Sequence, residues 1–426
     1  MTIKRKNLYH SLLFISSLLL ILLPAALISG PFLPDLFITL IGLIFLTLYS
    51  KDKNKVFIIS KITFFKLFII FFIFIVLGSI FSDSIFLSLK SSATYIRFGI
   101  FSIAVIYIFK NNENFIKFFY LALIFTLIIL LFDGYFQFFT GKNTFGYSNI
   151  RPDRLGGLFF DELILGSYIS KILPILITFI FLNKKIIHRN YTISLVVLSY
   201  ILIFLSGERS AFLLATFYMI LILPFIADLK KFFIIIILTI IFFSSLIMSN
   251  KTLKSRYFDQ MLTHTFQKTS TSSTFMPDHI GLFTSAIDIF QKNILFGGGV
   301  KTFRVNCKNT VNEKLMELKI DIPNLVFCNT HPHNYYLQLL AETGLVGFLF
   351  VLIILLKLLF NYFKQVIFLI NKKKMINKSY VCILAGLIVS IWPLATTGSF
   401  FNNWICSNLF LTIGIYLFVS SNEIKN

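Results

Sequence analysis

Long apolar runs constrain this sequence more than any other feature. A helix needs about 20 mainly apolar residues to cross the hydrocarbon core of a membrane. Twelve runs of roughly this length follow one another, at 8–29, 31–49, 62–81, 92–109, 115–139, 162–182, 191–207, 209–227, 232–249, 337–363, 379–396 and 401–420. The chain is 57% hydrophobic and only 13% charged, whereas soluble domains carry about 25% charged residues. The sequence therefore predicts an all-α, polytopic transmembrane bundle of about 12 helices.

Basic residues cluster in the links between these runs and give the chain a net charge of +21. The clusters at 4–6, 51–55, 184–189, 230–231 and 372–378 all fall on one side of the membrane if the runs alternate in direction. Cytoplasmic loops of membrane proteins carry such an excess. We therefore predict that both termini are cytoplasmic, and we predict no nucleic-acid partner. The first run has a basic start like a signal peptide but no convincing cleavage site, so we expect it to be retained as a helix.

Three parts follow from this topology. Residues 1–249 would hold helices 1–9, residues 250–336 one long loop on the side opposite the basic clusters, and residues 337–426 helices 10–12. Within the long loop, the amphipathic run 278–295 predicts a short helix at the membrane surface, which Gly297, Gly298 and Gly299 would end. If that side is the periplasm, Cys307 and Cys328 can form a disulfide, with two free thiols as the alternative. No spacing of Cys or His suggests a metal site, and we expect no cofactor.

The segment 329–347 carries the densest group of polar residues next to an apolar run. Pro332 suits a first helical turn, so we expect a helix to begin near 331–334. His331 and His333 would then lie at a helix N-terminus, where the positive end of the dipole favours a neutral imidazole that can accept a proton. Further along, Asn334, Gln338 and Glu342 recur every fourth residue and should share one helix face. A carboxylate in a segment that leads into the membrane is costly, which marks Glu342 as a candidate site residue.

Arginines are the second group of candidates. Arg209 sits at a tight turn, Arg154 precedes Glu162 in a medium loop, and Arg256 and Arg304 lie in the long loop. Planar guanidinium groups suit the oxygens of a phosphate or diphosphate. Solvated loop charges would explain each of them singly. Among the basic residues inside apolar runs, which are Lys66, Arg97 and Lys171, the most notable is Arg97, near the outer end of its run.

Four stretches together resemble the O-antigen ligase and polymerase superfamily of bacterial inner-membrane proteins. They are Gly-Glu-Arg209, Arg154-Leu-Gly-Gly-Leu-Phe-Phe-Asp-Glu162, Gly-Gly-Gly-Val-Lys-Thr-Phe303 and His333-Asn-Tyr-Tyr-Leu-Gln-Leu-Leu-Ala-Glu-Thr-Gly344. The resemblance covers most of the chain in topology, and its specific part is the block from about 278 to 347. It implies a metal-independent glycosyltransferase that uses an undecaprenyl-diphosphate-linked glycan as donor.

The resemblance also implies roles for individual residues. His333 is the leading catalytic candidate, with His331 as the alternative, and Arg209 is the leading contact for the diphosphate. Arg256 would be a second arginine of the family pattern. Substrate-binding candidates are Arg154, Glu162, Arg256, Arg304, His331, Asn334 and Glu342. The mechanism consistent with these roles is an inverting transfer in which an acceptor hydroxyl attacks the anomeric carbon.

Several functions remain open from the sequence. In a ligase the acceptor is the lipid A core, whereas in a polymerase it is another lipid-linked repeat unit. A lipid-linked glycan transporter would place polar residues near the middle of several helices, but here they gather toward one membrane face. A purely structural subunit would leave the His333 block unexplained.

Overall fold

The structure is a computed structural model that describes residues 3–51, 63–182, 189–260, 278–309, 328–372 and 376–423. These ranges are helical, apart from loops and one isolated bridge between Lys142 and Ser148. The elements are α1 (Ile3–Ala26), α2 (Phe32–Lys51), α4 (Thr63–Ile80), α5 (Ile85–Ala93), α6 (Ile96–Asn111), α7 (Glu113–Thr140), η1 (Gly157–Phe159), α8 (Leu165–Leu182), α9 (Arg189–Leu205), α10 (Arg209–Ile226), α11 (Leu229–Ser249), α12 (Lys251–Lys254), η2 (Ser255–Asp259), α14 (Asp278–Lys292), α16 (Tyr335–Asn371), α17 (Lys378–Ser390) and α18 (Asn403–Glu423).

Each of the twelve apolar runs coincides with a helix. Among the described residues, nine helices are long and apolar enough to cross a membrane, and a tenth span results if α11 and the bent segment after it are one unit. The remaining two, α9 and α17, are shorter apolar helices. The prediction of an all-α, multi-pass membrane protein is confirmed.

The interior of the bundle is built from α6, α8, α17 and α18. Nearly every residue of α6 from Phe98 to Phe109 is buried, and α6 packs on α18 while α8 packs on α17. By contrast, α11 exposes a row of large apolar side chains that includes Phe233, Ile237 and Ile241. Exposed apolar surface of this extent is what a lipid-facing helix presents.

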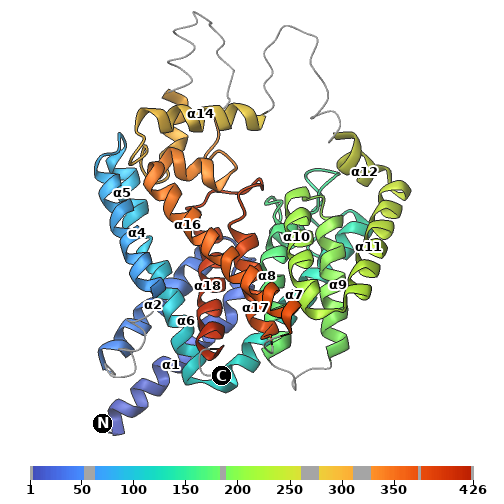
Figure 1. The fold of residues 1–426 in the computed structure, drawn as a ribbon, viewed down its shortest axis with the longest axis horizontal. Coiled ribbons are helices and arrows are strands. Elements are labelled where there is room, and N and C mark those ends of the chain that lie inside the picture. Colours follow the sequence, from blue (N-terminus) through green and yellow to red (C-terminus); the bar gives the residue numbers. More distant parts are fainter. Residues whose placement is uncertain are drawn as a thin grey trace, which may run out of the picture.

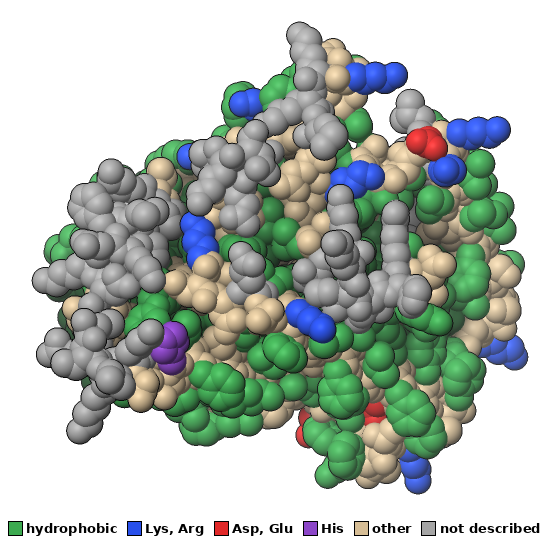
Figure 2. All heavy atoms as spheres, turned by 90° about the horizontal axis from the view of Figure 1, so that it is seen from below, with side chains coloured by type: hydrophobic (Ala, Val, Ile, Leu, Met, Phe, Trp, Pro, Cys, Tyr) green, Lys and Arg blue, Asp and Glu red, His purple; other side chains and the backbone are tan. Residues whose placement is uncertain are grey.

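Both termini lie at the same end of the bundle, and α14 crosses the opposite end (Figure 1). The surface helix predicted over 278–295 is therefore present as α14. Figure 2 views the end with the termini and shows basic side chains spread over it, with few acidic ones. This distribution agrees with the positive-inside pattern, although the basic residues at 52–62, 183–188 and 373–375 lie outside the described residues.

One span ends earlier than predicted. The run 379–396 predicted a helix of that length, but α17 ends at Ser390. Pro393 explains the difference, because a proline disfavours helical backbone in the residue before it and has no amide hydrogen to donate. The chain then runs without helix from Ile391 to Asn402 before α18 begins. This irregular segment forms part of the candidate functional site.

The start of α16 also departs from the prediction. The helix begins at Tyr335, and Asn334 caps it by accepting from the amides of Tyr336 and Leu337, so Pro332 precedes the helix. A kink follows at Gly344, whose φ is 64°. The backbone of Gly297 packs into this kink, where a β-carbon on Gly297 would lie 2.5 Å from the Gly344 nitrogen. Only glycine fits this contact, which fixes the 296–300 loop against the first turns of α16.

Candidate functional site

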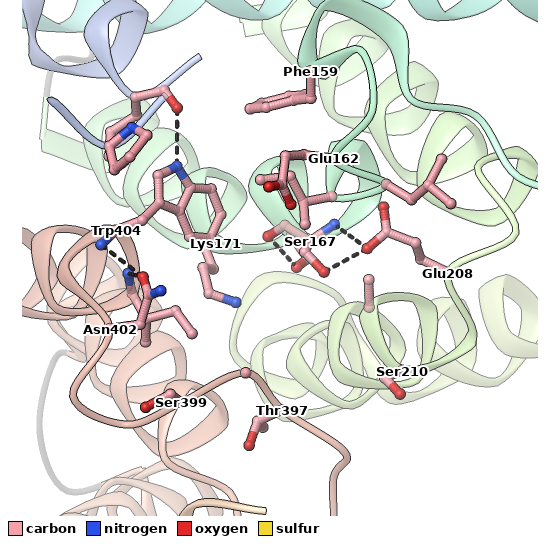
Figure 3. A pocket seen from close by; sticks show the side chains of 18 of the residues that line it. Phe159, Glu162, Ser167, Lys171, Glu208, Ser210, Thr397, Ser399, Asn402 and Trp404 are labelled. Atoms are coloured by element: carbon pink, nitrogen blue, oxygen red, sulfur yellow. Dashed lines mark hydrogen bonds between the residues drawn. The ribbon is translucent and has the colours of Figure 1, made fainter. Parts of the chain in front are cut away.

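A cavity of about 1230 Å³ opens at the end of the bundle that carries α14. Several helix ends meet there: the end of α1 and the starts of α8, α10, α16 and α18. The loop 154–164 and the irregular segment after α17 complete the walls. Figure 3 shows part of this lining, with Ser167 and Lys171 from α8, Glu208 and Ser210 beside α10, and Ser399, Asn402 and Trp404 from the C-terminal part.

Most of the residues singled out from the sequence line this one cavity. They are Arg154, Glu162, Arg209, Arg256, Arg304, His331 and His333. These residues come from five separate stretches of the chain, so only the tertiary fold brings them together. Asn334 and Glu342, the other two candidates, are not part of the lining.

The turn before α10 is held by a buried arginine. Gly207 adopts a φ of 72°, and a β-carbon there would lie 2.2 Å from the carbonyl oxygen of Asp153. Arg256 donates from Nε to the Gly207 carbonyl at 2.9 Å, and its Nη1 lies 3.1 Å from a carboxylate oxygen of Asp153. Arg256 is 8% exposed, so its charge is placed at the cavity wall with little freedom to move. It therefore supports the turn as well as lining the cavity.

Arg209 differs from Arg256 in having no protein partner. Neither a hydrogen bond nor an ion pair joins its side chain to another residue in the described ranges. The charges of Arg209 and Arg154 both act on Arg256. Like charges at close range repel one another, so the cluster leaves positive charge that an anionic ligand can neutralise.

A short chain of contacts connects Arg209 to the two histidines. Ser210, the next residue of α10, hydrogen-bonds through its hydroxyl to Thr396. The amide of Thr397 in turn donates to the carbonyl of His333 at 2.8 Å. The irregular segment after α17 therefore fixes the start of α10 relative to the start of α16.

The two histidine rings lie against each other, with centroids 4.3 Å apart. The side-chain amide of Asn329 lies 3.0 Å from Nε2 of His333, and the Thr330 hydroxyl lies 2.9 Å from Nδ1 of His331. Nε2 of His331 is buried. Burial lowers the pKa of His331 to about 4, and the nearby His333 and Arg304 act in the same direction. His331 is therefore neutral at ordinary pH.

The lowered pKa of His331 has a measurable consequence for stability. Its ordinary value is 6.5 and its folded value is about 4, so between these limits the unfolded chain binds a proton that the folded protein does not. Stability should therefore fall as pH drops from about 6.5 to about 4. We expect thermal unfolding of the detergent-solubilised His331→Asn variant to depend less on pH in this window than that of the wild type. The exposed His10 provides the control, since His10→Asn should keep the wild-type slope. Equal slopes in all three proteins would contradict a buried neutral His331.

The face of α16 that carries Gln338 and Glu342 turns toward other protein segments. Gln338 donates to Glu342 at 3.0 Å, in agreement with the predicted shared face. The Glu342 carboxylate accepts the amides of Lys301 at 2.9 Å and Phe303 at 3.2 Å. Gln338 also donates to Ser399 and accepts from the amide of Phe400. With 1% exposure, Glu342 holds the cavity walls together and does not reach the open space.

A disulfide joins Cys307 to Cys328. It connects the helical stretch 303–309, which carries Arg304, to the segment that leads to His331 and His333. Arg304 is exposed and lines the cavity. The Glu342 hydrogen bonds and the disulfide thus attach the Arg304 stretch at two points.

The structure distinguishes two basic residues that the sequence placed in apolar runs. Arg97 pairs with Asp35 at 2.7 Å and is not among the residues that line the cavity. Lys171 in α8 does line it. Other lining residues that the sequence did not single out include Lys301, Trp404 and the 396–399 segment. Pro393 followed by Thr-Thr-Gly-Ser was the available signal for the last of these.

Glu208 connects α10 to α8. Its carboxylate accepts the amides of Gly166 at 2.6 Å and Ser167 at 3.1 Å, and the Ser167 hydroxyl at 2.5 Å. It thereby caps the first turn of α8. Burial raises the pKa of Glu208, while these hydrogen bonds and Arg154 act in the opposite direction.

Backbone strain is concentrated at the same cavity. In the described part of the chain four residues other than glycine have a positive φ, and three of them line the cavity: Phe160, Lys301 and His333. Left-handed backbone is unfavourable for residues with a β-carbon and tends to occur at functional sites.

The overall charge of the lining is positive. Six Lys and Arg side chains face the cavity, against two Glu side chains. Within the described ranges, no three His, Cys, Asp or Glu side chains are grouped in a way that could hold a metal ion. A cavity with this lining can bind an anion such as a diphosphate through its guanidinium and ammonium groups.

A protein-family model matches part of the chain. No curated protein matches the chain. Residues 194–352 match the family model described as O-antigen ligase. The matched range contains Arg209, Arg256, Arg304 and both histidines, and it ends after the kink in α16. Over this range the chain is similar to the O-antigen ligase family, in agreement with the resemblance noted from the sequence.

Proposed function

We propose that this protein transfers a glycan from undecaprenyl diphosphate to a sugar of the lipid A core, at the periplasmic face of the bacterial inner membrane. The main supporting observation is that four arginines and two histidines line one cavity between the helix ends. The family match supports a membrane glycosyltransferase of the O-antigen ligase and polymerase type. The periplasmic location follows from the positive-inside pattern, because the cavity lies at the end opposite the termini.

The proposed step is one displacement at the anomeric carbon. An acceptor hydroxyl attacks this carbon and loses its proton to His333, and the bond from carbon to the diphosphate oxygen breaks. Undecaprenyl diphosphate leaves with the bonding electrons, and the configuration inverts. Arg209, Arg154 and Arg256 balance the negative charge on the leaving group. Their fixed positions around the Gly207 turn suit this role, because preorganised charges stabilise a transition state most effectively.

The lining also suits both the polyprenyl chain and the diphosphate of a lipid-linked substrate. Apolar side chains from the end of α1 and the start of α18, among them Leu27, Ile28 and Ile405, share the cavity with the cationic groups. A polyprenyl chain needs such an apolar path, while its diphosphate needs the cations.

Reconstitution tests the proposal directly. The purified protein in liposomes would be given an undecaprenyl-diphosphate-linked glycan and either lipid A core or a second lipid-linked repeat unit. We expect glycan transfer to the lipid A core together with release of undecaprenyl diphosphate. Transfer only to the lipid-linked repeat would instead identify a polymerase, the alternative within the family. Movement of the intact donor across the bilayer without release of diphosphate would contradict both and indicate a transporter.

A further inference from the structure

Lys171 is placed where a lysine is costly. It lies in α8, within a helix apolar enough to span the membrane, six residues after Leu165 and therefore about 9 Å along the helix axis. Ser167, Ser170 and Lys171 line the cavity. The rest of this helix is largely buried and apolar. A basic group in such a helix normally has a partner or a function.

No hydrogen bond or ion pair joins Lys171 to another residue in the part of the chain that the structure describes. Glu208, whose charge acts on Lys171, accepts three hydrogen bonds from the first turn of α8 and lies 4.0 Å from Arg154. Those contacts hold the carboxylate at the start of α8, where it attracts Lys171 without forming an ion pair within 4.0 Å. In Figure 3 the ammonium points into the open space between α8 and the 397–399 segment.

The ammonium group of Lys171 lies near an aromatic face. Nζ of Lys171 lies 5.9 Å from the ring centroid of Trp404, at the outer limit of a cation–π interaction. Trp404 is held in place, because its indole nitrogen donates to the carbonyl of Leu27 at 2.9 Å. The indole thus limits the positions that the ammonium can take. It does not neutralise the positive charge of the ammonium.

We propose that Lys171, beside the face of Trp404, forms a second anion-binding subsite that takes a phosphoryl group of a lipid substrate, in addition to the one formed by Arg209 and Arg256. This proposal rests on the proposed glycan transfer and extends it to a residue outside the arginine cluster. The phosphoryl group has two sources, the diphosphate of the donor lipid and a phosphate of the acceptor lipid. Lys171 is a binding residue in either case, since removal of the proton from the attacking hydroxyl is assigned to His333.

Binding measurements on three lysine variants test the subsite. Lys171→Met removes the charge at nearly constant volume, and Lys171→Arg keeps it. Lys66 is the matched control, because it lies in the apolar helix α4, is exposed, and is not among the residues that line the cavity. The protein in nanodiscs would be titrated with undecaprenyl diphosphate in one arm, and with vesicles that contain lipid A core in the other.

We expect Lys171→Met to weaken binding by about tenfold or more in one arm, since a hydrogen bond to a charged group contributes that much. The arm affected identifies the source of the phosphoryl group. Lys171→Arg should stay near the wild type, and Lys66→Met should match it. Unchanged binding of Lys171→Met in both arms would overturn the subsite, as would an equal loss for Lys66→Met.

An Arg209→Ala variant separates this proposal from the broader one. If the wild type binds undecaprenyl diphosphate and Arg209→Ala weakens it while Lys171→Met does not, only the Lys171 subsite fails. If the wild type binds neither probe, the proposed glycan transfer fails with it. A purely structural role of Lys171 would lower thermal stability in Lys171→Met and leave the affinity of the folded fraction unchanged.

Discussion

Replacing His333 by alanine should reduce the rate of glycan transfer by about 10²- to 10⁴-fold, the usual contribution of a general base. The acceptor hydroxyl would then have no positioned group to accept its proton. The readout is release of undecaprenyl diphosphate from the reconstituted protein under saturating donor. Affinity for the donor should change little, because the proposed role of His333 is toward the acceptor.

Two further variants make this result specific. His10 is exposed and lies in α1, away from the cavity lining, so His10→Ala should retain full activity. His331→Ala tests the neighbouring ring, which lies against that of His333. Activity near the wild-type level in His333→Ala, with loss in His331→Ala, would move the proton acceptor to His331. Full activity in both would remove a histidine base from the mechanism.

Arg209→Ala is the second variant for which we expect a large effect, about a 10²- to 10³-fold lower rate. The guanidinium has no hydrogen-bond or ion-pair partner in the described part of the protein, whereas Arg154 and Arg256 are already held by protein groups. Its removal therefore takes away much of the compensation for negative charge on the leaving diphosphate. Arg209→Lys should recover part of the rate, because an ammonium keeps the charge but lacks the planar fork. Donor binding and turnover would be measured separately in the same reconstituted system.

Arg151 provides a matched control for charge removal. It belongs to the neighbouring loop, its side chain is 51% exposed, and it does not line the cavity. Arg151→Ala should therefore leave transfer close to the wild-type rate. An equal loss in both variants would mean that general positive charge near the entrance matters, with no specific role for Arg209.

The sequence predicted the helices well because their signal is local. A run of about 20 apolar residues has few alternatives to a spanning helix. The early end of α17 was missed because Ile391, Trp392 and Leu394 continue the apolar composition around Pro393. Similarly, the kink at Gly344 depends on contact with Gly297, which is distant in sequence.

The candidate site was predicted in part. Arg209, His333 and their neighbours stood out because they are polar residues at helix starts. Lys171 did not, although Ser167, Ser170 and Lys171 share one face of α8 by their spacing. That spacing marks a polar side of the helix but does not say that this side meets a cavity. Arg97 and Lys171 look alike in sequence, and only the partner Asp35 distinguishes them. Whether a charge in an apolar helix is neutralised is a tertiary property.

The inward face of the first turns of α16 affects how an alanine scan of this block should be interpreted. Glu342 and Gln338 join the 301–303 amides to the 399–400 segment, so their loss would separate two walls without removing any group that meets the substrate. Such variants should regain activity at lower temperature or in a stabilising lipid, as folding defects do. Variants of Arg209 or His333 should not. Loss of activity alone would assign the same importance to residues that hold the walls and residues that act on the glycan, whereas a scan at two temperatures would separate them.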